Sequence, residues 1–215
     1  MVDNSLSIVI LAGGRSSRMG RDKATIEIDG VPLIRRIYDA VAACQDVHRF
    51  APDADDRSIS QHIYVVTPWA QKYRSLLPVT CHFIPEQQPH QGPLVAFSQG
   101  LAMTSSTWVL LLACDLPNLS TPVIQSWIDE LPSVGLESIA YLPKHFYKGW
   151  EPLCGFYRQI CHPWLLEYID GGGQSFQGWL KLHPVTELVV TDPLCLSNCN
   201  TPADLTRIVE NRFNA

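Results

Sequence analysis

Short apolar runs recur along this chain, and stretches that suit helices separate most of them. The runs are rich in β-branched residues, and the first is almost continuously hydrophobic, which is typical of strands buried on both faces of a sheet. They cover residues 7–11, 62–67, 80–84, 108–113, 138–142 and 185–190. Strands that alternate with helices form βαβ units, so we expect an α/β fold with a mostly parallel sheet.

Several of the intervening stretches carry helix signals. Apolar residues at helical spacing predict helices over residues 31–44 and 93–103. Pro32 and Pro93 lie where the first turn of a helix tolerates proline. Threonine-proline pairs predict two more helix starts, one over residues 121–131 and one near the C-terminus.

Composition limits the class of protein. The chain has 215 residues, of which 46% are hydrophobic and 17% charged, so we expect one domain over residues 1–215. It has no apolar run of about 18 residues and no signal-peptide pattern, so we expect no membrane contact and a cytoplasmic location. A formal net charge of -5 argues against broad nucleic-acid binding.

The cysteines and histidines do not indicate a metal centre. The seven cysteines are scattered and include no C-x-x-C pair, which favours reduced thiols over disulfides or a zinc site. Cys195 and Cys199 are the one pair close enough to consider. Two segments lack a helix or strand period: residues 45–61 are expected to be an inserted surface loop, and the three glycines at 171–173 a simple turn.

The sequence LAGGRSSRMGRDK, at residues 11–23, indicates a site for a nucleoside triphosphate. Gly13 and Gly14 let the backbone turn sharply and point consecutive N–H groups at phosphate oxygens. Three arginines and Lys23 add donors in an acidic chain. Loop positions that alternate cannot all face one ligand, so we rank Arg18 and Lys23 above the other two arginines. The alternative is an ordinary solvated loop, and neither a G-x-G-x-x-G nor a P-loop pattern occurs.

Two further positions could join this site. Asp115 follows the most hydrophobic run, and a carboxylate at the carboxyl end of a strand is well placed to hold Mg²⁺ beside substrate phosphates. Its alternative role is to cap the turn at Pro117 or the next helix. Gly92 opens a predicted helix, whose N-terminal N–H groups could face a ligand, although a plain helix start explains it equally well.

Residues 11–33 as a whole resemble the N-terminal signature of the MobA-like nucleotidyltransferases. The Asp22-Lys23 pair favours the branch that builds a molybdenum cofactor, since relatives of the sugar-nucleotide and isoprenoid pathways generally carry Pro-Lys there. The resemblance continues through GPL at 92–94, CDLP at 114–117, EPLCGFY at 151–157 and NCNTPADL at 198–205. It implies a Rossmann-like three-layer sandwich of the nucleotide-diphospho-sugar transferase type.

The resemblance also implies roles for single residues. The catalytic roles fall to Lys23, Arg18 and Asp115, with Asp115 holding Mg²⁺, and the acceptor is bound by Asn198 and Asn200. The nucleotide site comprises Leu11, Ala12, Gly13, Gly14, Arg18, Lys23, Glu86, Gly92, Pro93, Leu94 and Asp115. The chain departs from the family at two points: Glu86 is the nearest acidic residue to a position where relatives carry Asp, and Thr67 stands where they often carry Asn.

The activity implied by this resemblance is transfer of GMP from GTP to molybdopterin carrying molybdenum, with release of pyrophosphate. The nucleotide would bind to a half at about residues 1–120 and the acceptor to a half at about 121–215. Transient contact with proteins that deliver molybdopterin or mature molybdoenzymes is expected. Two alternatives stay open: a cytidylyltransferase acting on molybdopterin or on a sugar or polyol phosphate, and a non-catalytic nucleotide-binding regulator.

Overall fold

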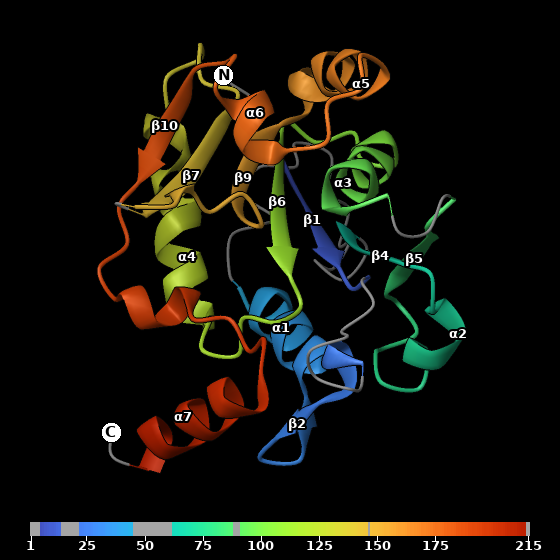
Figure 1. Cartoon of the computed structure of the whole chain (residues 1–215), viewed down its shortest axis with the longest axis vertical. Coiled ribbons are helices and arrows are strands. Elements are labelled where there is room, and N and C mark those ends of the chain that lie inside the picture. Colours follow the sequence, from blue (N-terminus) through green and yellow to red (C-terminus); the bar gives the residue numbers. More distant parts are fainter. Residues whose placement is uncertain (1–4, 14–21, 45–61, 88–90, 146, 214–215) are drawn as a thin grey trace.

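A single sheet forms the centre of the molecule (Figure 1). The computed structural model describes residues 5–13, 22–44, 62–87, 91–145 and 147–213. The sheet has eight strands in the order β10-β7-β9-β6-β1-β4-β5, with β8 paired to β7. They are β1 (Leu6–Leu11), β4 (Ile63–Thr67), β5 (His82–Pro85), β6 (Trp108–Ala113), β7 (Ala140–His145), β8 (Gly149–Trp150), β9 (Cys154–Arg158) and β10 (Val185–Leu188). All six predicted runs contain strands, which confirms the α/β fold.

The order and direction of the strands indicate where an open α/β sheet binds its ligand. β1 pairs in parallel with β4 on one side and with β6 on the other, and β4 pairs in parallel with β5. The chain therefore runs outward from β1 to β5 and then crosses back to β6, so the strand order reverses between β1 and β6. Open α/β sheets bind ligands at such a reversal, beyond the carboxyl ends of the strands. β9 is antiparallel to both β6 and β7.

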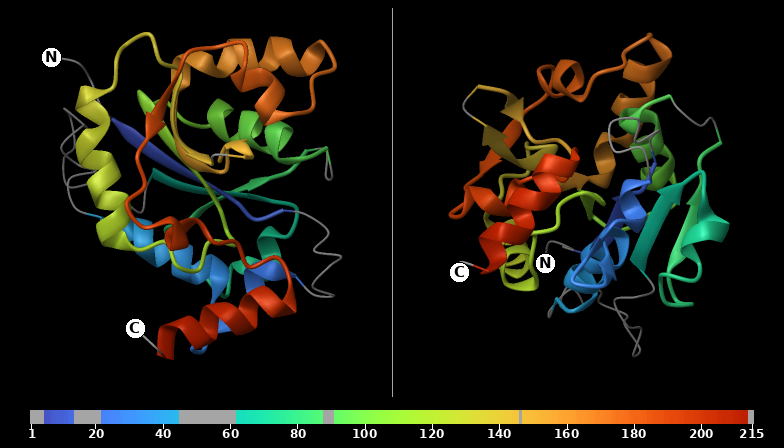
Figure 2. Two further views of the ribbon diagram at one scale, coloured as in Figure 1. Left: turned by 60° about the vertical axis from the view of Figure 1, so that its left-hand side comes forward. Right: turned by 60° about the horizontal axis from the view of Figure 1, so that its bottom comes forward.

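Helices cover both faces of the sheet, as Figure 2 shows. Along β1, Ile8 and Ile10 point to one face and Val9 and Leu11 to the other, because side chains alternate along a strand. The first face packs against α1 (Leu33–Ala42) and α4 (Thr121–Glu130). The second packs against α3 (Pro93–Ala102), α5 (His162–Asp170) and α6 (Phe176–Leu180). The short elements are α2 (Ala70–Tyr73), η1 (Lys23–Thr25), η4 (Leu131–Ser133), η5 (Gln159–Cys161) and η6 (Pro193–Leu196).

A third, smaller hydrophobic cluster lies apart from the sheet. It joins the last helix, α7 (Pro202–Phe213), to a hairpin of β2 (Glu27–Ile28) and β3 (Val31–Pro32), which lie near each other in Figure 1. Its buried members are Ile26, Ile28, Leu33, Cys199 and Ile208. This cluster, which we call the α7 cluster, therefore ties the C-terminal part of the chain to the N-terminal part.

The hairpin corrects one expectation. Pro32 belongs to β3 and pairs with Glu27, so α1 begins at Leu33, two residues after the predicted start at residue 31. Asp29 and Gly30 both have positive φ, 54° and 75°, the geometry in which an Asp-Gly pair closes a tight hairpin.

Two other segments were singled out in the sequence. Gly171 ends α5 and Gly172 has a φ of 88°, so the three glycines form the expected turn. Residues 45–61 lie outside the described residues.

Candidate active site

Lys23, Asp115 and Asn200 meet at the carboxyl edge of the sheet. Lys23 Nζ lies 3.3 Å from Asp115 Oδ2 and donates a hydrogen bond to Asn200 Oδ1. Lys23 comes from the N-terminal signature, Asp115 follows β6, and Asn200 precedes α7. The fold thus brings residues from three distant motifs into direct contact.

Local structure on the N-terminal side holds Lys23 in place. Asp22 caps η1 by accepting a hydrogen bond from the backbone N–H of Ala24 at 3.0 Å. The other oxygen of the same carboxylate accepts from Lys72 Nζ at 2.8 Å and from the Tyr73 hydroxyl at 2.7 Å. Burial and the neighbouring Asp22 carboxylate raise the pKa of Tyr73, so the hydroxyl stays a donor. Asp22 therefore anchors the backbone just before Lys23, which gives a physical reason for the Asp22-Lys23 sequence motif.

Asp115 is a buried carboxyl group, with 9% of its surface exposed. Burial raises its pKa above the ordinary value, and the neighbouring Lys23 opposes that rise. Within the described part of the chain, its Oδ1 is buried without a hydrogen-bond partner. A buried carboxylate oxygen without a partner is energetically unfavourable, and a cation would relieve it. This oxygen fits a hard divalent cation that takes one protein carboxylate and completes its shell with phosphates and water.

The carboxyl ends of β1, β4 and β5 lie side by side at one edge of the sheet. The Thr67 hydroxyl donates to the carbonyl of Ala12 at 2.8 Å, which fixes the backbone just before Gly13. Glu86, directly after β5, brings its carboxylate so close to Gly13 that a Cβ at position 13 would overlap its Oε1. The structure therefore places the Glu86 side chain beside Gly13, and Thr67 holds the backbone that precedes this glycine.

Among the other predicted nucleotide-site residues that the structure describes, Leu11 and Ala12 are buried, and Gly92, Pro93 and Leu94 lie at the start of α3. Leu11 and Ala12 are buried in opposite hydrophobic clusters, and the carbonyl of Leu11 accepts from the backbone N–H of Cys114 at 3.2 Å. Gly92 precedes α3 with a φ of 91°, a conformation that favours glycine. Leu94 is buried in the core under α3, whereas Pro93 is exposed. Gly14 and Arg18 lie outside the described residues.

The start of α7 explains how Asn200 is held. The Thr201 hydroxyl accepts from the backbone N–H of Asp204 at 3.2 Å, and Asp204 Oδ2 accepts in return from the backbone N–H of Thr201 at 2.9 Å. This reciprocal pair is a capping box. The backbone N–H of Asn200 also donates to Asp204 Oδ2, at 3.1 Å. The Thr201 hydroxyl also donates to Asp204 Oδ2, at 2.9 Å. This hydrogen bond, together with those from the backbone N–H groups of Asn200 and Thr201, holds the pKa of Asp204 below its ordinary value. Thr201 thus caps the helix, while the Asn200 side chain points to Lys23.

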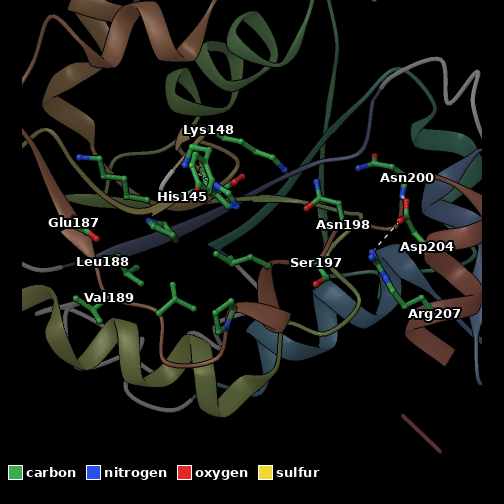
Figure 3. A pocket seen from close by; sticks show the side chains of 17 residues that line it. His145, Lys148, Glu187, Leu188, Val189, Ser197, Asn198, Asn200, Asp204 and Arg207 are labelled. Carbon is green, nitrogen blue, oxygen red and sulfur yellow. Dashed lines mark hydrogen bonds and ion pairs between the residues drawn. The ribbon is translucent and has the colours of Figure 1, made fainter. Parts of the chain in front are cut away.

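A cavity of about 840 Å³ opens beside Asn200, as Figure 3 shows. Asn198 lies between His145 and Lys148 on one side and Asn200 and Asp204 on the other. Other charged side chains that line the cavity are Lys144, Glu151, Glu187 and Arg207. Its wall therefore offers both charges and neutral amides to a polar ligand.

Some site residues could not be found from motifs. Lys72, Tyr73 and the cavity lysines carry no local pattern, because only the tertiary fold brings them to the site. Asp204 did have a signal, the Thr201-x-x-Asp204 spacing of a capping box.

Two further observations concern metal binding by clustered side chains and membrane-spanning helices. Cys195 and Cys199 are buried in different clusters, and the described residues contain no group of three or more His, Cys, Asp or Glu side chains that could hold a metal ion. None of the helices in the described ranges combines the length and hydrophobicity that a bilayer crossing requires.

This chain is similar to known proteins in both sequence and fold. A sequence model of the MobA-like NTP transferase domain matches residues 8–185. A Trichormus variabilis protein named probable molybdenum cofactor guanylyltransferase is 49% identical over 211 residues, which cover 98% of this chain and 93% of that protein.

Two solved structures share the fold. Molybdopterin-guanine dinucleotide biosynthesis protein A from Archaeoglobus fulgidus has a TM-score of 0.73 at 21% identity, covering 97% of this chain and 100% of that one. A Mycobacterium tuberculosis protein solved in complex with manganese has a TM-score of 0.64 at 18% identity, covering 96% and 98%. The family match spans most of the chain and confirms the resemblance seen in the motifs. The chain therefore belongs to the MobA-like NTP transferase family, a family of nucleotidyltransferases.

Proposed function

We propose that this protein transfers GMP from GTP to molybdopterin carrying molybdenum, giving the guanine dinucleotide form of the cofactor and pyrophosphate. The observation that carries the proposal is the contact of Lys23 with Asp115 and Asn200, at the strand reversal where an α/β sheet binds its ligand. The relatives with near full-length similarity are named for this activity.

The reaction needs positioning and charge neutralisation more than a protein nucleophile. The terminal phosphate of molybdopterin attacks the α-phosphorus of GTP, a new P–O bond forms, and the bond to the β-phosphate oxygen breaks with its electrons leaving on pyrophosphate. Lys23 stabilises the charge that develops on this leaving group, and Arg18 is assigned the same role. The backbone N–H groups of Gly13 and Gly14 are assigned to binding the phosphates.

Asp115 is the residue proposed to hold Mg²⁺, together with phosphate oxygens of the substrate. When bound, the ion would neutralise charge on those oxygens. The buried and unpartnered Oδ1 of Asp115 supports this assignment.

The two halves of the chain are assigned to the two substrates. The half at about residues 1–120 contributes Leu11, Ala12, Glu86, and Gly92 through Leu94 to the nucleotide side. The half at about 121–215 supplies the cavity beside Asn198 and Asn200, where the pterin phosphate would lie. Asn198 and Asn200 each offer a side-chain amide for hydrogen bonds.

The experiment that tests this proposal compares nucleotides. Purified protein is supplied with molybdopterin carrying molybdenum, MgCl₂ and GTP, CTP or ATP, and released pyrophosphate is measured. We expect turnover with GTP, with discrimination on the order of 10⁴ at the upper end, because a wrong base leaves polar groups of the site unpaired. Higher turnover with CTP would make the protein a cytidylyltransferase. Nucleotide binding without any pyrophosphate release would make it a regulator.

A further inference from the structure

Asn200 makes a contact that an acceptor-binding role does not explain. Its side-chain Oδ1 accepts a hydrogen bond from Lys23 Nζ, although 177 positions separate the two residues in the sequence. We propose that Asn200, which lines the acceptor cavity, is a positioning residue for Lys23. It would hold the Lys23 ammonium group where that group meets the triphosphate. The inference rests on the proposed function for the identity of that nucleotide, GTP.

The segment that carries Asn200 is fixed from three sides. The backbone N–H of Asn200 donates to Asp204 Oδ2 in the capping box of α7. One residue earlier, the backbone N–H of Cys199 donates to the carbonyl of Asp115 at 2.9 Å. The Cys199 side chain has no exposed surface and belongs to the α7 cluster. Asn200 is therefore a preorganised acceptor and not a mobile loop residue.

Lys23 is attached to the same cluster. The backbone N–H of Ile26 donates to the carbonyl of Lys23 at 3.0 Å, and the Ile26 side chain is fully buried in the α7 cluster. The cluster thus holds the backbones of both partners. A lysine side chain loses rotamer entropy when it is fixed. A hydrogen-bond acceptor that is already in place orders Lys23 before the substrate arrives, so that binding the substrate loses less entropy.

The side-chain amide of Asn200 suits this role chemically. An amide oxygen holds an ammonium group without cancelling its charge, whereas a second carboxylate would neutralise the cation that the triphosphate needs. Asp115, the carboxylate partner of Lys23, is also the residue proposed to hold a divalent cation. Asn200 would remain an acceptor for Lys23 when Asp115 turns its charge to that ion.

A double-mutant cycle on nucleotide affinity tests the inference. GTP is titrated calorimetrically, with MgCl₂ and without any acceptor, into the wild type, Asn200→Ala, Lys23→Ala and the double variant. We expect Asn200→Ala to weaken GTP binding about three- to tenfold, the range of one lost hydrogen bond. The double variant should bind GTP no more weakly than Lys23→Ala, because the effect of Asn200 acts through Lys23.

Matched controls separate this role from a structural one. Asn118→Ala removes an amide that donates to the Leu194 carbonyl at 3.3 Å, on the same C-terminal segment, and should keep wild-type GTP affinity. Thermal melts without nucleotide check folding, and Asn200→Leu, similar in shape without an acceptor, replaces the alanine variant if that one melts early. Unchanged GTP affinity in a folded Asn200 variant, or additive losses in the double variant, would overturn the inference. Failure of the wild type to bind GTP would instead overturn the proposed function.

Discussion

Stability and catalysis make opposite demands on Asp115. Burial raises the pKa of this carboxyl group, so the folded state binds its proton more tightly than the unfolded state does. The stability that the proton confers is present at low pH and is lost as pH rises through the raised pKa. The ionised form that the proposed cation needs is therefore the form that weakens the fold.

Asp115→Asn should separate these two demands. We expect pyrophosphate release to be nearly abolished, because the amide keeps the volume and loses the charge that holds a divalent cation. The melting temperature at neutral pH should equal or exceed that of the wild type, because a neutral side chain is cheaper to bury. A pyrophosphate assay and melts by circular dichroism between acidic and neutral pH measure both effects. Near-normal turnover in a folded variant would remove Asp115 from the mechanism.

At the scale of elements, the residue after β5 brings its side chain against the end of β1, at Gly13. A Cβ there would overlap Glu86 Oε1, the far end of a flexible side chain, so Gly13→Ala should displace Glu86 at little expense in stability. We expect weaker GTP binding by calorimetry and a nearly unchanged melting temperature. Combining the change with Glu86→Ala removes the overlap. Because Glu86 is itself assigned to the nucleotide site, the double variant is compared with Glu86→Ala alone. Additive losses of GTP affinity would show that displacement of Glu86 is not the cause.

Elements were predictable where a local pattern determines them. Apolar runs located six of the eight strands of the central sheet but neither β8 nor β9, and the start of α3 followed from Gly92 and Pro93. The Asp29-Gly30 pair was a readable hairpin signal. The sequence does not show that Pro32 pairs with Glu27, however, and without that pairing Pro32 fits equally well in the first turn of a helix.

The site itself was only partly predictable. Lys23 and Asp115 lie in motifs, and their positions at strand ends follow from the rule for open α/β sheets. The contact between Lys23 and Asn200 depends on packing between distant segments. The hydrogen bond from the Tyr73 hydroxyl to Asp22 depends on such packing too. No local spacing encodes such contacts.

At the scale of the whole molecule, the α7 cluster joins the two ends of the chain at the active site. It buries few side chains compared with the two clusters that flank the sheet, so α7 should open locally at a lower free energy than global unfolding requires. Because Ile26 and Cys199 both belong to it, loosening this cluster should disturb Lys23 and Asn200 together.

Ile208→Ala tests this coupling without touching the site. Ile208 is 2% exposed, and removing a buried isoleucine side chain costs about 2–5 kcal/mol. We expect weaker GTP binding, measured by calorimetry well below the melting temperature. Leu165→Ala is the matched control, because Leu165 is the fully buried side chain of α5 and belongs to the cluster on the sheet's second face. That variant should lose comparable stability and keep its GTP affinity, since neither Lys23 nor Asn200 depends on its cluster. If both variants lose affinity equally, general destabilisation explains the effect; if neither does, the α7 cluster does not position the active site.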